Sequence, residues 1–356
     1  MTKRHIALLL SAAALVGSGV AAAPPISVSV PLVHLVRSGQ SIQKAVDAAR
    51  PGDTVLLMPG TYHQSVKVTT PGLTLRGTSQ GTTVLKPATT KPTDDCGSRG
   101  NGICVVGTKA ERLEDVTVSN LTVTGFPRAG LVAVGTEGLT VRHVSAERNG
   151  LWGLAEERSR RSEYRENLAR GNGDAGVFLA NTITAEQGAV DTGGTVVADN
   201  RLEDNRIGVT VRRLRDLTVA GNHVTGNCAG VFVVGDENKP RAGALTVRGN
   251  LVAQNNKYCA KTARLPFLQG SGIVLTGAED TEVRHNTVLG NSGTSPLSGG
   301  IVLFRSFVGA ANERNRVHDN ALQDNAPADL VDQESAKRGN TFRQNSCRAS
   351  KPAGLC

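Results

Sequence analysis

The apolar residues of this chain fall into short, strand-like segments that are separated by glycine and asparagine. The clearest segments begin with a glycine and continue with alternating branched apolar residues. They read GVFL from Gly176, GVTV from Gly208, GVFV from Gly230, and GIVL from Gly272 and again from Gly300. Gly208 and Gly230 are 22 residues apart. A period near this length, with three strand-like pieces in each unit, predicts a coil of parallel strands in which every repeat forms one rung.

A single rung cannot bury its apolar positions, so stacked rungs are expected to share a long, thin core of Val, Ile and Leu. Successive side chains of a strand point to opposite faces. The first and third residues after each glycine are therefore predicted to point into the coil. The second and fourth are predicted to point outward. Because segments such as GVFV are apolar at both sets of positions, the outer face is expected to be partly covered or to be a contact surface.

Asparagines occur in pairs with one internal spacing of five residues. Asparagine tolerates the left-handed backbone of tight corners. Amides that recur at the same corner can stack and form hydrogen bonds from one rung to the next. We therefore expect corner and ladder residues here rather than catalytic ones. The seven pairs are Asn167/Asn172, Asn200/Asn205, Asn222/Asn227, Asn250/Asn255, Asn286/Asn291, Asn320/Asn325 and Asn340/Asn345.

The two ends of the repeat region carry features that would cover the core. Ser41 can cap a short helix whose apolar face is Ile42, Ala45, Val46 and Ala49. Such a helix would close the open strand edge at the start of the coil, within a cap of about residues 31–65. The tail, about residues 340–356, is predicted to be closed by a disulfide and a loop.

With these repeats the chain resembles the right-handed parallel β-helix proteins of the pectate lyase-like superfamily, over roughly residues 31–345. The fold class that this resemblance implies is all-β: a single-stranded right-handed parallel β-helix with a short N-terminal capping helix. The strings GHG, RIK and DPHE, which mark well-described enzymes of this fold, do not occur in the sequence.

The first 23 residues have the pattern of a secretion signal. Lys3, Arg4 and His5 precede an apolar run that ends in three alanines at residues 21–23. This pattern predicts a cleaved signal over residues 1–23, one β-helix domain over residues 24–356, and a secreted, extracellular protein. The alternative is a retained membrane anchor. No stable membrane span is predicted later in the chain, and we expect a monomer.

The six cysteines suit an oxidising compartment. Their spacing lacks the short pairs with nearby histidine that a zinc site needs, so no metal site is predicted. Proximity along the chain favours three structural disulfides among the fifteen connectivities that six cysteines allow. The predicted pairs are Cys96–Cys104, Cys228–Cys259 and Cys347–Cys356.

The formal net charge is +9. Beyond Arg158–Arg161 there is no dense basic run, and aromatic residues are not interleaved with basic ones, so no nucleic-acid partner is predicted. A basic exported surface suits an anionic polysaccharide. The alternative is that the charge only keeps the protein soluble.

Insertions between the repeats point to a face where a ligand could bind, because insertions in a solenoid form loops that wall a groove. The loops are predicted at residues 181–195, 235–245 and 257–271. On the strand face between them, Phe178 and Phe232 point outward and could stack on sugar rings. The alternative is that they pack under the loops. The other predicted substrate-binding residues are Asn181, Glu237, Lys239 and Arg305.

A lyase that acts on uronates needs a base to remove the proton next to the carboxylate and a cation to stabilise the enediolate. The family resemblance implies an Arg or Lys base and often Ca²⁺ held by several aspartates. The sequence shows no aspartate cluster with calcium-binding spacing, so no cofactor is predicted. The candidate catalytic residues are Arg212, Arg213, Asp236 and Arg241.

Glu156 stands in the inward column of its strand, where a carboxylate would need a partner or a raised pKa. Its neighbourhood, EERSRRSEYRE, is strongly charged. We therefore expect this rung to be out of register and Glu156 to be exposed.

Two functions remain open from sequence alone. The first is a secreted β-helix protein that binds, and in a lyase-type reaction cleaves, an extracellular anionic polysaccharide. The second is a non-catalytic surface or accessory β-helix protein of the periplasmic copper-accessory type. A copper site would want clustered His, Met or Cys, and the seven histidines are scattered.

Overall fold

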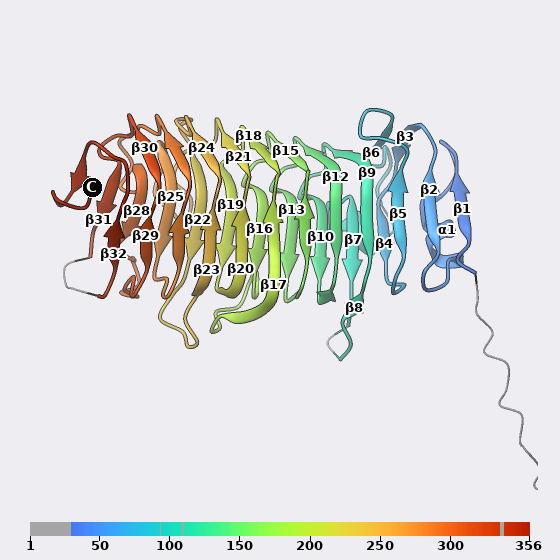
Figure 1. Ribbon diagram of the computed structural model, residues 1–356. Helices are drawn as coiled ribbons and strands as arrows, with labels where there is room; N and C mark the ends of the chain where they lie inside the picture. The colour runs from blue at the N-terminus through green and yellow to red at the C-terminus, as the bar shows by residue number, and fades with distance from the viewer. Residues whose placement is uncertain (1–29, 93, 109, 335–337) are drawn as a thin grey trace, which may run out of the picture. The chain divides into compact units, whose positions relative to one another are not determined.

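Three short strands separated by tight corners make up a typical turn of the coil that residues Pro31–Cys356 form (Figure 1). The computed structural model describes residues 30–356, apart from residues 93, 109 and 335–337. The predicted signal, residues 1–23, lies outside the described residues. In the part of the chain that is described, no helix is long and apolar enough to cross a membrane.

One side of the coil is an 11-stranded sheet in which every strand pairs in parallel with the equivalent strand of the next rung. This sheet contains the segments that begin with glycine. Its strands are β4 (Val66–Val68), β7 (Ile103–Val106), β10 (Ala129–Val134), β13 (Trp152–Glu157), β16 (Ala175–Ala180), β19 (Ile207–Arg212), β22 (Ala229–Val234), β25 (Ser271–Thr276), β28 (Gly299–Phe304), β31 (Leu330–Asp332) and β33 (Ser350–Lys351).

The remaining sides form a 20-stranded parallel sheet, in which two ladders are joined by the long strands β9 and β12. Outside the two large sheets, β8 (Leu113–Glu114) and β11 (Thr136–Glu137) form a two-stranded parallel sheet. The 20 strands are β1 (Val33–Val36), β2 (Thr54–Leu57), β3 (Gly60–His63), β5 (Thr74–Gly77), β6 (Thr83–Lys86), β9 (Thr117–Thr124), β12 (Thr140–Glu147), β14 (Glu163–Arg165), β15 (Leu168–Arg170), β17 (Val190–Ala198), β18 (Arg201–Glu203), β20 (Leu214–Ala220), β21 (His223–Thr225), β23 (Gly243–Arg248), β24 (Leu251–Ala253), β26 (Glu282–Arg284), β27 (Thr287–Leu289), β29 (Arg316–His318), β30 (Ala321–Gln323) and β32 (Thr341–Arg343).

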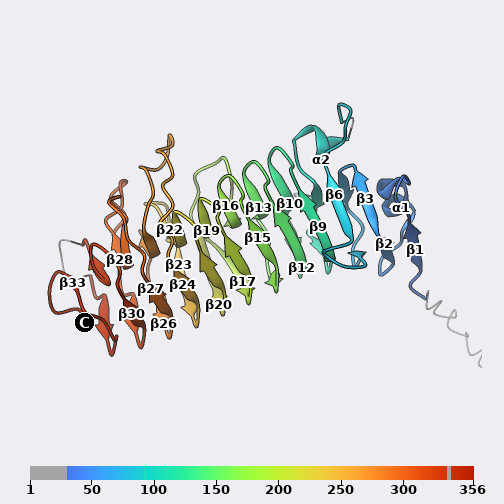
Figure 2. The same cartoon turned by 90° about the horizontal axis from the view of Figure 1, so that it is seen from above.

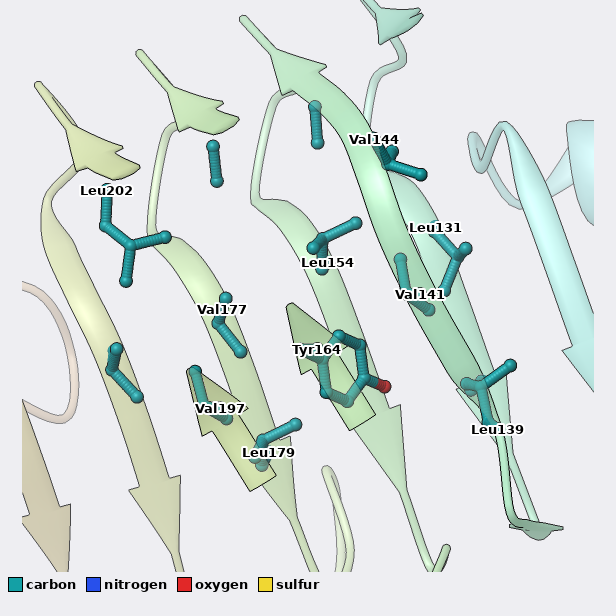
Figure 3. Packing of buried hydrophobic residues seen from close by; sticks show 14 of the residues in the cluster. Leu131, Leu139, Val141, Val144, Leu154, Tyr164, Val177, Leu179, Val197 and Leu202 are labelled. Carbon is teal, nitrogen blue, oxygen red and sulfur yellow. The ribbon is translucent and has the colours of Figure 1, made fainter. Parts of the chain in front are cut away.

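The register of the 11-stranded sheet confirms the alternation predicted from the glycine segments. Val209 pairs with Val177 on one side and with Val231 on the other, and all three belong to the core inside the coil. Phe178 and Phe232, one position further along their strands, belong to a second apolar cluster on the outer face of the sheet. Figure 3 shows the inner cluster, to which facing strands contribute Leu and Val side chains.

The N-terminal cap forms as predicted. Helix α1 (Ile42–Ala48) starts after Ser41, whose hydroxyl accepts a hydrogen bond from the backbone N–H of Lys44 at 3.2 Å. Ile42 and Val46 are buried, and Ala45 and Ala49 pack against the same core. The helix thus covers the first rung with the face that the sequence pattern indicates.

The three predicted disulfides are present, as Cys96–Cys104, Cys228–Cys259 and Cys347–Cys356. The last closes the C-terminal tail, as expected. Cys228 lies at the start of a rung and Cys259 in the long insertion that follows, so the second disulfide ties that insertion to the coil.

The asparagines form two buried ladders at neighbouring corners. In one ladder, the side-chain amide of Asn205 donates to Asn227 at 3.1 Å, and that of Asn227 donates to Asn255 at 2.8 Å. Each amide also donates to a strand carbonyl, as Asn205 does to Ala169 at 3.0 Å. The expected ladder role is confirmed. The left-handed backbone, however, lies at the residue before the asparagine, as at Asp204 (φ 58°) before Asn205 and Gly226 (φ 68°) before Asn227, and not at the asparagine itself.

The last asparagine pair needs a correction of register. Asn345, the second member of the last pair, accepts from Asn320, which is the first member of the preceding pair. Asn340 accepts from Asn315, which belongs to none of the seven predicted pairs. The spacing of five between Asn340 and Asn345 therefore repeats the spacing between Asn315 and Asn320.

The expectation for Glu156 is wrong, because its side chain is only 1% exposed and lies inside the coil. It pairs in register with Ala133 on one rung and Leu179 on the next, and the small alanine leaves room for it. The phenol of Tyr164, which is visible in the core in Figure 3, donates a hydrogen bond to the Glu156 carboxyl at 3.0 Å. Burial raises the pKa of Glu156, while the hydroxyls of Ser162 and Tyr164 oppose that shift. The rung is in register despite its charged sequence.

The asparagine ladder predicts a large stability difference between two adjacent residues. Asn255→Ala removes an acceptor for both the backbone and side-chain N–H of Asn227, and a donor to Asn291 at 2.9 Å. Because these groups are buried, we expect the free energy of unfolding to fall by at least about 2 kcal/mol in denaturant titration. Asn256→Ala is the control: it also loses two hydrogen bonds, to the Gly290 carbonyl and from the Ser292 N–H, but both are exposed to water. Equal losses in the two variants would contradict the ladder's role.

The buried Glu156 predicts a pH-dependent effect of Glu156→Gln. In the unfolded chain this carboxyl titrates near its ordinary pKa of 4.5, whereas burial raises its pKa in the folded state. The free energy of unfolding of the wild type should thus fall relative to that of the variant as pH rises from about 4.5 towards the raised folded-state pKa, with a slope of at most about 1.4 kcal/mol per pH unit. Below that pH both states are protonated and the difference should level off. Thermal unfolding across pH 4–8 measures this, with the exposed Glu163→Gln on the same rung as control; a difference that does not change with pH would refute it.

Candidate functional site: a basic groove on the 11-stranded sheet

A groove with a volume of about 860 Å³ lies on the outer face of the first four strands of the 11-stranded sheet. Its floor includes Val106 of β7 and Val132 and Val134 of β10. Lys67 of β4 lies at one end and Trp152 of β13 at the other.

One wall of the groove is built around α2 (Asp95–Ser98). Asp94 caps this short helix by accepting from the backbone N–H of Gly97, and the disulfide Cys96–Cys104 joins it to β7. The backbone N–H of Arg128 donates to the carbonyl of Gly100 at 2.8 Å, so the segment before β10 continues the wall. Figure 2 shows α2 and the adjoining loop projecting from the coil.

The opposite wall consists of residues 107, 108, 110 and 112, which lie before β8, and the turn after β13. Arg112 donates a hydrogen bond to the backbone carbonyl of Arg158, which links the two segments. Its guanidinium also lies 3.8 Å from the carboxylate of Glu137. Each wall therefore presents two arginines, Arg99 and Arg128 on one side and Arg112 and Arg158 on the other.

The groove is basic overall, because its lining contains five cations and two carboxylates. Asp95 lies 3.0 Å from Arg99 and 3.9 Å from Lys67, so one carboxylate serves two cations. Arg128 and Arg158 are exposed, and neither forms an ion pair with any described residue. These two guanidinium groups are thus available to an anionic ligand.

Trp152 marks the inner end of the groove. Its ring stacks on Phe178 with centroids 4.7 Å apart, and the Arg128 guanidinium lies 5.8 Å from the ring centroid. Its indole N–H donates to Asp174 at 3.0 Å. Burial raises the pKa of Asp174, while the indole hydrogen bond opposes that shift. Trp152 is the sole tryptophan of the chain, so its fluorescence reports on this groove.

The four candidate catalytic residues do not line this groove. Arg212 and Arg213 support a loop at residues 181–189, of which Ile183 and Thr184 do line it. Arg213 is only 1% exposed; it donates to the carbonyl of Ala185 at 2.9 Å and lies 3.2 Å from the Asp236 carboxylate. Arg212 donates to the carbonyl of Ile183 at 3.1 Å. Burial, with Arg213 nearby, lowers the pKa of Arg212 to about 10, which leaves it charged at neutral pH. Asn181, a predicted substrate-binding residue, donates to two carbonyls of the same loop.

Arg241 also makes internal contacts, with the carbonyl of Ala311 and with Glu313 at 3.2 Å. Catalytic roles for Arg212, Arg213, Asp236 and Arg241 stay predictions, and their contacts favour a structural role.

The two predicted sugar-stacking residues are covered. Phe178 is 8% exposed and Phe232 is 2% exposed, since both pack in the outer apolar cluster. Their burial favours the alternative that they pack beneath loops. Glu237, Lys239 and Arg305 are exposed, but they do not line the groove.

Sequence reasoning missed the groove residues Lys67, Arg112 and Arg128, because the N-terminal rungs carry the weaker glycine segments. One signal was available. Cys96 and Cys104 bracket a short insertion before a strand, and that insertion forms a wall of the groove.

Comparisons with known proteins agree with this architecture. A family model described as "Right handed beta helix region" matches residues 94–252, and one described as "Periplasmic copper-binding protein (NosD)" matches residues 180–351, each a little under half of the chain. No curated protein sequence matches significantly.

Three of the solved structures with a similar fold are as follows. The A-module of the mannuronan C-5 epimerase AlgE4 of Azotobacter vinelandii is 17% identical, with a TM-score of 0.57, and 86% of this chain and 90% of that chain are covered. An alginate lyase from Paenibacillus sp. str. FPU-7 is 14% identical, with a TM-score of 0.53 and coverage of 88% and 99%. A DFA-IIIase from Arthrobacter chlorophenolicus A6 is 14% identical, with a TM-score of 0.53 and coverage of 84% and 79%.

The chain thus has the right-handed parallel β-helix fold. At these identities the similarity to solved structures establishes the fold and leaves the function to be argued from the site.

The residues present do not fit a metal centre of the kind the copper-binding family suggests. Among the described residues no group of three or more His, Cys, Asp or Glu side chains could hold a metal ion. All six cysteines are in disulfides. His285 and His318 lie 6.4 Å apart between ring centroids, and both ring nitrogens of His318 contact carboxylates, those of Asp319 and Glu282.

The support of loop 181–189 can be tested with Asn181→Ala. Removing the side-chain amide breaks its bonds to the carbonyls of Gln187 and Gly188, so the loop should open more often. We expect a glutamate-specific protease to cut after Glu186 several-fold faster, at a temperature where the coil stays folded. Thr184→Ala, an exposed change in the same loop, should leave the cleavage rate unchanged. Equal rates in Asn181→Ala and the wild type would contradict this role.

Proposed function

We propose that this protein binds an anionic polysaccharide in the groove between α2 and the opposite wall that contains Arg112 and Arg158. The observation that carries the proposal is the pair of exposed arginines, Arg128 and Arg158, which face the groove from opposite walls without an ion pair to any described residue. Guanidinium groups recognise carboxylates and sulfates by paired hydrogen bonds. The apolar floor of Val106, Val132 and Val134 suits the less polar faces of sugar rings.

The comparisons support this class of ligand. Several proteins of similar fold act on polysaccharides by their names, among them a mannuronan epimerase and an alginate lyase. The three disulfides fit an exported protein. Secretion to the outside of the cell, where such polymers occur, belongs to the proposal.

Cleavage of the polymer is the finer part of the proposal. A β-elimination needs a base that removes the proton next to the carboxylate and a cation that stabilises the enediolate. Lys67, Arg128 and Arg158 border the ligand's path; as cations they would stabilise the enediolate, and one of them would have to be neutral to act as the base. Incubation with a uronate polymer decides this part, because elimination creates an unsaturated product that absorbs in the ultraviolet. Binding without a change in absorbance would mean that the protein binds the polymer and does not cleave it by elimination.

The second candidate is the copper-accessory function, which the family match over residues 180–351 favours. The described residues supply no cluster of metal ligands in that range. We therefore propose polysaccharide binding, and copper binding by the isolated protein would count for the alternative.

The groove assignment predicts the effect of Arg128→Ala with Arg158→Ala. Each exposed charge-assisted contact is worth on the order of 1 kcal/mol, so the double variant should bind alginate or polygalacturonate about ten-fold or more weakly at low salt. Calorimetry gives the affinity. In the wild type, Trp152 fluorescence should change on binding, and neutral dextran should have no effect.

The control is Arg248→Ala with Arg343→Ala. Both arginines are exposed on the 20-stranded sheet, so this variant removes the same charge from another face. Equal weakening by both double variants would mean that net charge, and not the groove, governs binding. No binding by the wild type would refute the proposed function.

A further inference from the structure

The outer face of the 11-stranded sheet changes character along the coil. One register column runs through all its strands and contains Lys67, Cys104, Val132, Ala155, Phe178, Thr210, Phe232, Val274, Val302, Val331 and Lys351. From Ala155 to Val331 every member is buried, with exposed fractions between 0% and 8%. On the earlier rungs Lys67 and Val132 are partly exposed, and Cys104 is buried in its disulfide. The groove lies over β4 to β13.

The later rungs are buried because two inserted segments lie over them. Leu268 and Leu297 are 0% and 1% exposed and pack in the same cluster as Phe232, Val274 and Val302. The first insertion is fixed to the coil by the disulfide Cys228–Cys259 and by Arg206, which donates to the carbonyl of Ala260 at 2.7 Å. Figure 2 shows this insertion projecting from the coil on the same side as α2. The first insertion, which lies over the sheet, is therefore attached to the coil at both Cys259 and Ala260.

The inner end of the groove is closed by a stack and a loop. Trp152 stacks on Phe178, which follows Ala155 in the register column, on the next rung. Beside them Ile183 packs on the outer cluster, its backbone N–H donating to Glu157 at 3.3 Å and its carbonyl accepting from Arg212. A ligand that reaches Trp152 meets side chains ahead of it and cannot continue along the sheet.

The groove is also short. It spans four strands, from β4 to β13, and neighbouring strands are about 4.8 Å apart, so its floor is about 15 Å long. Lys67 at the other end lies on the first strand of the sheet, where the next element is α1: Gln43 accepts from the backbone N–H of Lys67 at 2.8 Å. The groove therefore begins at Lys67, at the N-terminal end of the sheet, and is closed at Trp152.

We propose that the groove binds the terminus of an anionic polysaccharide and not its middle, an inference that rests on the proposed function. The terminal acidic sugar lies against Trp152, between Arg128 and Arg158. The chain then passes Lys67 and leaves at the N-terminal end of the coil. Arg158, next to Glu157 of β13, thus contacts the first sugars, and Lys67 contacts sugars further along.

The test compares one uronate polymer in two chain lengths, intact and hydrolysed to short oligomers, by titrating Trp152 fluorescence in the unmodified protein. A site for chain ends gives the same Kd in both cases when concentration is expressed per chain. A site for internal segments gives a Kd per chain that falls as the number of internal positions grows, about ten-fold for a ten-fold longer polymer. That second result would overturn the inference and leave the proposed function standing. Absence of binding by both preparations would overturn both.

Two single variants provide an independent measurement on a disaccharide, which is too short to reach from Trp152 to Lys67, and on a long chain. Arg158→Ala should weaken binding of both ligands several-fold, since the shortest ligand occupies the closed end. Lys67→Ala should weaken the long chain and leave the disaccharide within about two-fold of the wild type. Equal weakening of the disaccharide by both variants would contradict terminal binding. Arg248→Ala should affect neither ligand.

Discussion

The buried side-chain amides at the corners are the interactions on which the rest of the structure depends. A corner with left-handed backbone turns peptide N–H groups and carbonyls inward, away from water, and each needs a partner. Asn227 meets this need by accepting from the backbone and side chain of Asn205 and donating to Asn255 and the carbonyl of Leu202. Because each amide bonds to the next rung, the corners fix the register that aligns the Val and Ile columns inside the coil.

The regular stack of rungs does not determine whether the outer face of the 11-stranded sheet is open or covered, and this differs from rung to rung. Over β22 to β28, Leu268 and Leu297 cover Phe232 and its neighbours, so the sheet there has two apolar faces. Over β4 to β13 the walls stand apart and the face stays open. The same strand architecture thus supports a covered half, which contributes burial, and an open half, which contributes a binding surface.

Buried charge in this protein serves mainly to hold loops. Arg213 and Arg241 reach backbone carbonyls of inserted loops and each meets one carboxylate, Asp236 and Glu313 respectively. A guanidinium has five donors in a fixed plane, so it can bridge a loop carbonyl and an acid at once. Glu156 differs, since it lies inside the coil with a phenol as partner, and burial favours its neutral form. Arg128 and Arg158 of the groove form no ion pair with any described residue and so do not belong to these networks.

The sequence by itself determined the repeating part of this protein. The period of the glycine segments, the five-residue spacing of asparagines, the Ser41 cap and the cysteine proximities are local or periodic signals, and each led to the element observed. Only the tertiary structure decided where the outer face is open, because that depends on the path of long insertions whose contacts are distant in sequence, such as Arg206 with Ala260. It also decided that Glu156 is buried: the space for its side chain comes from Ala133 on the rung before, and its partner Tyr164 comes from the opposite side of the coil. A charged run looks solvated when each residue is considered alone, whereas the register of the stack fixes which of its side chains must point inward.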